Sequence, residues 1–308
     1  MASTTKSLYE YQKDSIWIKE YPIHYAGCNF TARMTIVRLA NGKLFIHSPC
    51  EIDESTQAAI ERLGTVEFIV APGSYHYFHV RSAQAAFSNA ETFICPGIER
   101  KQPEIEFDWI LGDRPDARWE ADFEQVLVRG NRYIWEVAFF HKTTKTLILV
   151  DLIENITDET EHANWVLKFW WKVVFHMWNN PKPAPEYQMG WKDKTAACRS
   201  LEKILEWDFK KIILAHGDLI EADAKARARE AWAVPLRIAR ARQAASAANC
   251  QVRSLSTTLS SRTMRPQPPH WTPTSKHAAR LKHISFGSTP ACNNSFAAKI
   301  KLVAALRA

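Results

Sequence analysis

The charge of this chain changes abruptly near residue 236, and that change limits where a folded domain can lie. The 308 residues carry 40 Lys/Arg and 33 Asp/Glu, a formal net charge of +7 at pH 7. No Asp or Glu follows Glu230, whereas residues 236–308 hold 12 Lys/Arg, which leaves the remainder with 28 basic and 33 acidic residues, a net charge of −5. We therefore predict a mildly acidic domain over residues 1–236 and a basic, low-complexity, disordered tail over residues 237–308.

The composition of the predicted domain favours a globular protein in a reducing compartment. Hydrophobic residues make up 46% of the chain, which is enough to fill a sizeable core. The six cysteines are scattered, with no C-x-x-C pair, as expected for reduced thiols. We expect a cytoplasmic protein with no secretory signal and no membrane span. The basic tail resembles no nucleic-acid module, so we expect no specific nucleic-acid partner.

The order of strand and helix patterns is typical of a layered α/β domain. Strand patterns come first and are joined by the hairpin signal Asn41-Gly42. Strand–helix units, a second run of strands and a final strand–helix unit follow, and this order predicts an αββα sandwich. The predicted strands are 14–21, 32–39, 43–48, 66–71, 92–95, 123–129, 133–140, 146–150 and 211–215. The predicted helices are 56–63, 82–89, 159–177, 192–207 and 221–232.

Polar residues follow three of the predicted strands where those strands end. They are His76, Asp151 and His216. Metal ligands and catalytic groups commonly lie at such strand ends, and two histidines with a carboxylate suffice for one zinc or iron ion. An alternative remains open, because buried His and Asp side chains also hydrogen-bond loop backbones without any metal.

The phrases around these residues resemble the metallo-β-lactamase superfamily, and within it a branch known only as a domain of unknown function. The resemblance covers about residues 9–236. The phrases that carry it are Leu44-Phe45-Ile46-His47-Ser48-Pro49, Val70-Ala71-Pro72 with a following His, Phe139-Phe140-His141, Leu147-Ile148-Leu149-Val150-Asp151, and Trp207-Asp208-Phe209 leading to Ala215-His216-Gly217-Asp218.

The resemblance implies a reduced ligand set. If His76 takes the last place of the superfamily's H-x-H-x-D-H motif, its first His, second His and Asp are replaced by Ala71, Gly73 and Tyr75. Asp151 then matches the bridging Asp and His216 the late His. Glu136, or alternatively His141, falls where the middle His belongs. With three ligands missing, the resemblance favours one metal ion over two.

Three other features allow both a functional and a structural interpretation. His47 and Cys50 could form a nucleophilic pair, but a packed thiol is the simpler interpretation. His79 could add a ligand or only end a turn. The aromatic stripe Trp165–Trp178 is best explained by core packing, with a pocket wall or the face of a homodimer as the alternatives.

The sequence therefore predicts a metal-dependent hydrolase acting on a small organic ester, lactone or thioester. One zinc or iron ion would be held by His76, Asp151 and His216, with Glu136 or His141 as a fourth ligand. Asp151 and Glu136 would be the catalytic residues, Glu136 as ligand or general base. A metal-free binding or scaffold protein and a non-haem iron oxidoreductase are the alternatives, since fold-level analogy does not fix function.

Overall fold

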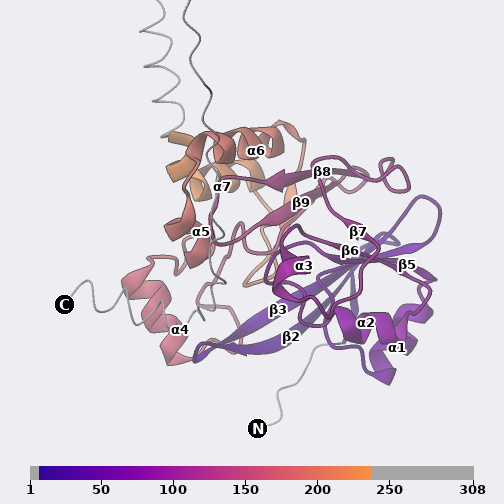
Figure 1. Ribbon diagram of the computed structural model, residues 1–308. Coiled ribbons are helices and arrows are strands. Elements are labelled where there is room, and N and C mark those ends of the chain that lie inside the picture. The colour runs from indigo at the N-terminus through magenta and orange to yellow at the C-terminus, as the bar shows by residue number, and fades with distance from the viewer. Residues whose placement is uncertain (1–6, 238–308) are drawn as a thin grey trace, which may run out of the picture. The chain divides into compact units, whose positions relative to one another are not determined.

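Two β-sheets form the centre of the structure, and helices cover their outer faces, so the predicted αββα architecture is confirmed (Figure 1). The computed structural model describes residues 7–237, all of which belong to one unit, Met1–Arg242. A second unit, Gln243–Ala308, and with it nearly all of the predicted disordered tail, lies outside the described residues.

The first sheet has seven strands in chain order. They are β1 (Tyr9–Gln12), β2 (Ile16–Tyr25), β3 (Cys28–Arg38), β4 (Leu44–His47), β5 (Val66–Ala71), β6 (Glu91–Ile94) and β7 (Trp109–Ile110). β2 and β3 form a long hairpin that turns at Ala26 and Gly27, both with positive φ, the backbone that two-residue hairpin turns require. From β4 to β7 the strands are parallel, so β4 and β5 end at the same edge.

The second sheet has four strands in the order β11-β10-β9-β8. They are β8 (Phe123–Val128), β9 (Glu136–His141), β10 (Thr146–Ile148) and β11 (Lys211–Ile213). β10 and β11 are parallel, and β9 runs antiparallel to β10. An isolated bridge between Gly73 and Glu136 joins the loop after β5 to the start of β9. The two sheets therefore meet at the edge where β5, β10 and β11 end.

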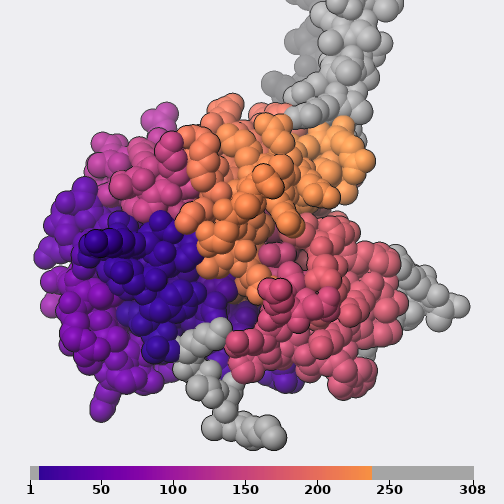
Figure 2. All heavy atoms as spheres, turned by 180° about the vertical axis from the view of Figure 1, so that it is seen from behind, coloured from indigo at the N-terminus to yellow at the C-terminus, as the bar shows by residue number. Residues whose placement is uncertain are grey.

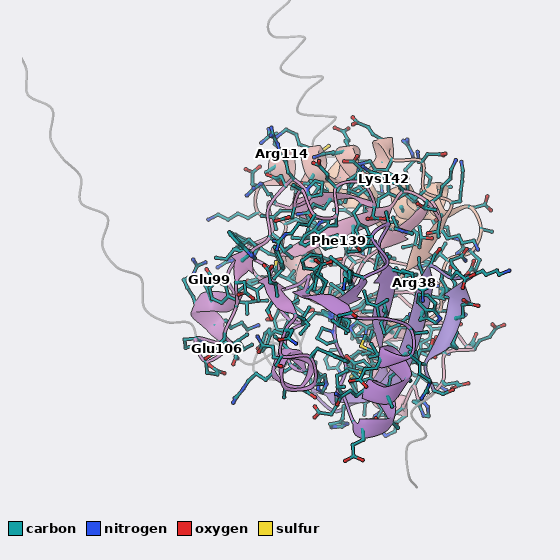
Figure 3. The ribbon with its side chains drawn as sticks, turned by 90° about the vertical axis from the view of Figure 1, so that its right-hand side faces the viewer. Arg38, Glu99, Glu106, Arg114, Phe139 and Lys142 are labelled. Carbon is teal, nitrogen blue, oxygen red and sulfur yellow. The ribbon has the colours of Figure 1, made fainter. Side chains whose placement is uncertain are left out.

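Helices α1 (Glu54–Glu61), α2 (Val80–Ala86) and α3 (Ile98–Lys101) accompany the first sheet, and α6 (Lys194–Glu206) and α7 (Ala224–Ala231) cover the second (Figure 1). Aromatic rings fill the space between the sheets, where Phe45 contacts Phe68, Trp119 and Phe139 edge-on. Figure 3 shows Phe139 at the centre of this packing, with the labelled charged side chains around it. This core fixes the positions of the strand ends.

The structure corrects the predicted helix 159–177. The helix begins only after Asn164, whose side chain accepts a hydrogen bond from the backbone N–H of Leu167 and caps α4 (Trp165–Phe169). A π-helical turn, η1 (Trp170–Val174), continues it. A short helix that the sequence does not predict, α5 (Pro185–Gly190), follows, with Pro185 in its first turn, where proline fits. Among residues 7–237 no helix has the length and apolar character needed to span a membrane.

Candidate metal centre

Three polar side chains from three separate loops meet at the edge where the two sheets join. The Nε2 atom of His76 lies 3.2 Å from Oδ1 of Asp151, and Nε2 of His216 lies 3.4 Å from the same oxygen. One ligand atom from each residue lies within 4.8 Å of the other two, and within residues 7–237 no other group of this kind occurs. The three residues singled out in the sequence therefore lie together, and their role as ligands stays a prediction.

His216 is held in place from strand β3. Its Nδ1 atom is 3.0 Å from the carbonyl oxygen of Thr31, so the ring donates its Nδ1 proton there and turns Nε2 toward Asp151. Arg33, two residues along the same strand, donates hydrogen bonds to the carbonyls of Leu214 and Gly217, which flank His216. The strand thus fixes both the ring and the backbone on either side of it.

Glycine is required immediately after His216. Gly217 has a φ of +84°, and a Cβ atom there would lie 2.2 Å from the carbonyl oxygen of Asn155. Only glycine lets the two loops approach this closely without strain. The His-Gly phrase in the sequence therefore has a steric reason beside any functional one.

His76 is oriented by a hydroxyl from the end of β4. Its Nδ1 atom is 2.8 Å from Oγ of Ser48, which directs Nε2 toward Asp151. The loop before it is tied to the second sheet, because the Ser74 amide donates to the carbonyl of Trp135. Gly73 packs against Val150 so closely that a Cβ atom would lie 2.9 Å from its side chain. One glycine, Gly73, and one hydroxyl, that of Ser48, thus position this part of the site.

Asp151 is buried and its second carboxylate oxygen, Oδ2, has no hydrogen-bond partner. Burial alone would raise the pKa of Asp151, but the charge of His76 and the hydrogen bond with His216 outweigh it and hold the pKa well below its ordinary value. A buried carboxylate with an unsatisfied oxygen is costly. The side chain is therefore suited to accept a cation.

Both carboxylate oxygens of Glu136 are turned toward the backbone beside Asp151. One carboxylate oxygen accepts the backbone N–H of Val150 at 2.7 Å, and the other accepts that of Asp151 at 2.9 Å. Burial and the nearby charge of Asp151 raise its pKa to about 8 against the lowering effect of these N–H groups. Glu136 thus positions the backbone that carries Asp151, and its role as ligand or general base stays a prediction.

His141, the other residue predicted for the middle position, lies outside the group of three. It is the last residue of β9, at the end opposite to Glu136, and its Nδ1 atom is 2.8 Å from Oγ1 of Thr144 in the following turn. Burial lowers the pKa of His141 to about 4. The strand carries its side chain away from Asp151, because β9 runs antiparallel to β10.

The remaining sequence candidates have structural roles. The Cys50 thiol contacts the carbonyl of Glu51, and burial raises its pKa to about 12, so it is no nucleophile near neutral pH. His47 is fully buried, and burial together with the charge of His76 lowers its pKa to about 3. His79 pairs with Glu51 at 3.0 Å and stays outside the group of three.

The donor atoms fit a single metal ion. Bonds of about 2.0–2.2 Å to nitrogen and oxygen would place neighbouring ligand atoms roughly 3.0–3.5 Å apart. The two distances to Asp151 Oδ1, 3.2 and 3.4 Å, fall in this range. Each histidine is also oriented by a contact at its other ring nitrogen, as metal-bound histidines are. The sequence does not point to the supporting residues Ser48, Thr31 and Arg33, since nothing in their spacing shows which loop they face.

Solved structures of metallo-β-lactamases share this fold. The chain matches DIM-1 metallo-β-lactamase exposed to ceftazidime with a TM-score of 0.53 and 12% identity, over 75% of this chain and 98% of that one. It matches the FIM-1 metallo-β-lactamase from Pseudomonas aeruginosa in its mono-zinc form with a TM-score of 0.50 and 10% identity, over 79% of this chain and 96% of that one. It matches a metallo-β-lactamase from Pontibacter korlensis with a TM-score of 0.50 and 12% identity, over 73% of this chain and 96% of that one. By its fold, the chain falls in the metallo-β-lactamase-like class.

Within that class, the chain belongs to the family described as domain of unknown function DUF4336, whose model matches residues 13–192. The matched segment includes His76, Glu136 and Asp151 and ends before His216. A comparison with curated proteins gives no match. The resemblance seen in the sequence phrases is thus confirmed at the level of fold and family.

Proposed function

We propose that this protein is a metal-dependent hydrolase with a single zinc or iron ion held by His76, Asp151 and His216. The observation that carries the proposal is the convergence of two imidazole Nε2 atoms and one carboxylate oxygen within 4.8 Å, from three loops. The unpartnered Oδ2 atom of Asp151 supports it, because a buried anion needs a counter-charge.

The proposed substrates are small organic esters, lactones or thioesters. A bound ion of this kind polarises a carbonyl group and lowers the pKa of water. The similar structures described above are metallo-β-lactamases, one of them in a mono-zinc form, which supports hydrolytic chemistry by analogy. In this chain Ser48 and the Thr31 carbonyl would hold the two imidazole rings, and Glu136 would hold the backbone of Asp151.

A metal-free binding protein is the second candidate, and one observation favours it. The distances of 3.2 and 3.4 Å from Asp151 to the two histidines are also those of ion pairs. In that case a protonated imidazole, rather than a metal, would balance the carboxylate. The donor set of two His and one carboxylate would equally suit an iron-dependent oxidoreductase. The two enzyme hypotheses separate on the metal found and on whether turnover needs dioxygen.

The Asp151→Asn variant tests the proposal, with Asp122→Asn as the matched control. Both aspartates are buried and both sit beside strands of the second sheet, but Asp122 accepts only the backbone N–H of Ala40. We expect wild type and Asp122→Asn to hold close to one zinc or iron per chain and to hydrolyse p-nitrophenyl acetate, a γ-lactone or an acyl thioester. Asp151→Asn should lose both properties and keep its fold, because the amide retains the shape of the carboxylate.

The opposite outcome would support the metal-free hypothesis. In that case no variant holds metal, and Asp151→Asn lowers the free energy of unfolding by about 1–3 kcal/mol, the cost of an unsatisfied buried group. Stoichiometric iron with oxygen-dependent oxidation of a substrate would instead favour the oxidoreductase.

A further inference from the structure

The segment α4–η1 presents two different faces. Its inner face is packed: Leu167 and Trp171 are buried with Cys28 and Phe30 of strand β3. Its outer face is open to solvent, where Trp165 is 77%, Phe169 49% and Val173 54% exposed. In Figure 2 the rose-coloured atoms of this part of the chain form a lobe on the flank of the unit. We define Trp165, Phe169 and Val173 as the outer stripe.

Lysines border the outer stripe. Lys168 and Lys172 are exposed, and their ammonium groups lie 5.7 and 4.6 Å from the ring centre of Trp178. Residues 162–185 contain three lysines, four tryptophans and no Asp or Glu, whereas Asp158, Glu159 and Glu161 come just before this segment and Glu186 just after it. Asp158 lies 3.8 Å from Lys172, and this exposed pair is screened by water.

We propose that the outer stripe binds the surface of an anionic lipid bilayer. Tryptophan and phenylalanine are suited to the boundary between headgroups and acyl chains, and lysines beside them attract anionic headgroups. The helix would lie in the plane of the interface, with its inner face still packed on β3. The proposal concerns the lipid surface only and does not depend on the proposed hydrolase activity.

The size of the stripe favours a bilayer over a second protein copy. Its three side chains expose roughly 300–400 Å² of apolar surface, taking about 150–250 Å² for a whole aromatic side chain. A stable protein interface needs about 800 Å² on each partner. Shallow insertion into a bilayer has no such minimum, because binding grows with each apolar side chain that enters.

The lysines that border the outer stripe also favour a lipid surface over a second copy of the chain. In a two-fold symmetric dimer each copy would present the same face to its partner. Lys168 and Lys172 of both copies would then lie in the same interface, and like charges brought together oppose association. An anionic lipid surface supplies the complementary charge instead. The homodimer face considered from the sequence is therefore the less favoured use of this segment.

Flotation with lipid vesicles tests the proposal on the full chain. The vesicles contain phosphatidylcholine with phosphatidylglycerol, or phosphatidylcholine alone. The double variant Trp165→Ala/Phe169→Ala should bind the anionic vesicles at least about tenfold more weakly than wild type, since two apolar side chains no longer enter the interface. Lys168→Gln/Lys172→Gln should weaken binding to anionic vesicles and leave binding to phosphatidylcholine unchanged. All variants should melt as wild type does, because these side chains are exposed.

Phe78→Ala is the matched control, because Phe78 is 63% exposed and lies in the loop before α2, away from the stripe. It should bind vesicles as wild type does. The basic residues after 237 are present in every variant, so their attraction for lipid cancels in the comparison. The proposal is overturned if Trp165→Ala/Phe169→Ala weakens binding to anionic vesicles by less than threefold. It is overturned equally if Phe78→Ala weakens this binding by as much as the double variant does. It is also overturned if light scattering shows a wild-type dimer that this variant dissociates.

Discussion

The two ends of strand β9 place buried ionisable side chains in opposite settings. Glu136 begins the strand beside Asp151, and His141 ends it, about 17 Å away for a six-residue strand. Both residues are buried, and burial shifts the pKa of each away from its ordinary value. Burial alone therefore does not separate a functional end of the sheet from a structural one.

The contacts of the side chains do separate the two ends. At the Glu136 end, His76 and His216 turn their Nε2 atoms to one carboxylate, while their other ring nitrogens are occupied by Ser48 and Thr31. At the other end, His141 contacts Thr144 in its own turn and belongs to no group of three metal-ligating side chains among the described residues. Convergence on a shared anion is what makes the Glu136 end of β9 the candidate metal site.

The largest expected effect comes from removing the metal. A chelator should lower the stability of wild type by about 4 kcal/mol where the ion had been present at about a thousandfold its Kd. For a domain of this size, that is a fall in Tm of roughly 8–16 °C. His141→Ala should keep this chelator-dependent fall, and His216→Ala should lose it. Equal chelator-dependent falls in Tm in the two variants would contradict a metal site at the Glu136 end of β9.

Arg33 gives the next largest effect. Replacing it with Met removes both hydrogen bonds to the carbonyls that flank His216, and should weaken metal affinity by about 10–100-fold. Arg38→Met, on the same strand, is the control, because Arg38 binds the Leu63 carbonyl and lies over the ring of Trp17. Titration with zinc against a competing chelator measures both. Unchanged affinity in Arg33→Met would show that His216 needs no such support.

Glu136→Gln tests whether this residue acts through the backbone. The amide NH₂ would face a backbone N–H donor, and we expect a loss of about 1–3 kcal/mol in the free energy of unfolding. Glu124→Gln is the control, since Glu124 forms only a half-exposed ion pair with Lys142. Urea unfolding measures both variants. If Glu136→Gln unfolds like wild type but loses turnover with its metal retained, Glu136 is a catalytic base after all.

The smallest expected effect comes from Asp53. Its pKa is lowered, as that of Asp151 is, but by hydrogen bonds from Thr56 and Ser55 rather than by histidines. Hydrogen bonds from Thr56 and Ser55 lower the pKa of Asp53 to about 2, and the side chain caps α1. Asp53→Ala should cost about 1 kcal/mol near neutral pH. Because the folded pKa lies below the unfolded value of about 3.9, the stabilisation is present above pH 4 and is lost as the pH falls toward 2.

Asp53→Asn is the control for that titration. Asparagine caps a helix without a titrating carboxylate, so the variant should stay close to wild type near neutral pH. The stability gap between wild type and Asp53→Ala should narrow in acid, whereas the gap between Asp53→Asn and Asp53→Ala should not. A gap that is constant from pH 6 to pH 2 in both comparisons would contradict the assigned pKa.

The sequence predicted the fold better than the details of the site. Alternation and turn signals located nearly every strand, because those patterns depend on neighbours along the chain. The sequence does not indicate the short strands β1 and β7 or the short helices α3 and α5, since two to six residues carry no clear period. The predicted helix 159–177 begins too early, because apolar spacing does not show that Asn164 caps the helix.

The residues around the candidate site mark the limit of such prediction. His76, Asp151 and His216 could be found because each follows a strand end. Glu136 and His141 could not be told apart, since both flank the same strand and only the register of β9 against β10 decides which end meets Asp151. Arg33 contacts the Leu214 carbonyl, 181 positions away in the sequence, and Ser48 contacts His76, 28 positions away. Such separations in sequence leave no local pattern.

The central claim is that His76, Asp151 and His216 bind one metal ion. The most direct test is the metal content of protein purified without chelators, measured by mass spectrometry for wild type and for His76→Ala/His216→Ala. Near-stoichiometric zinc or iron in wild type and its loss in the folded double variant would agree with the claim. Wild-type protein without zinc or iron, even after incubation with either metal, would contradict it.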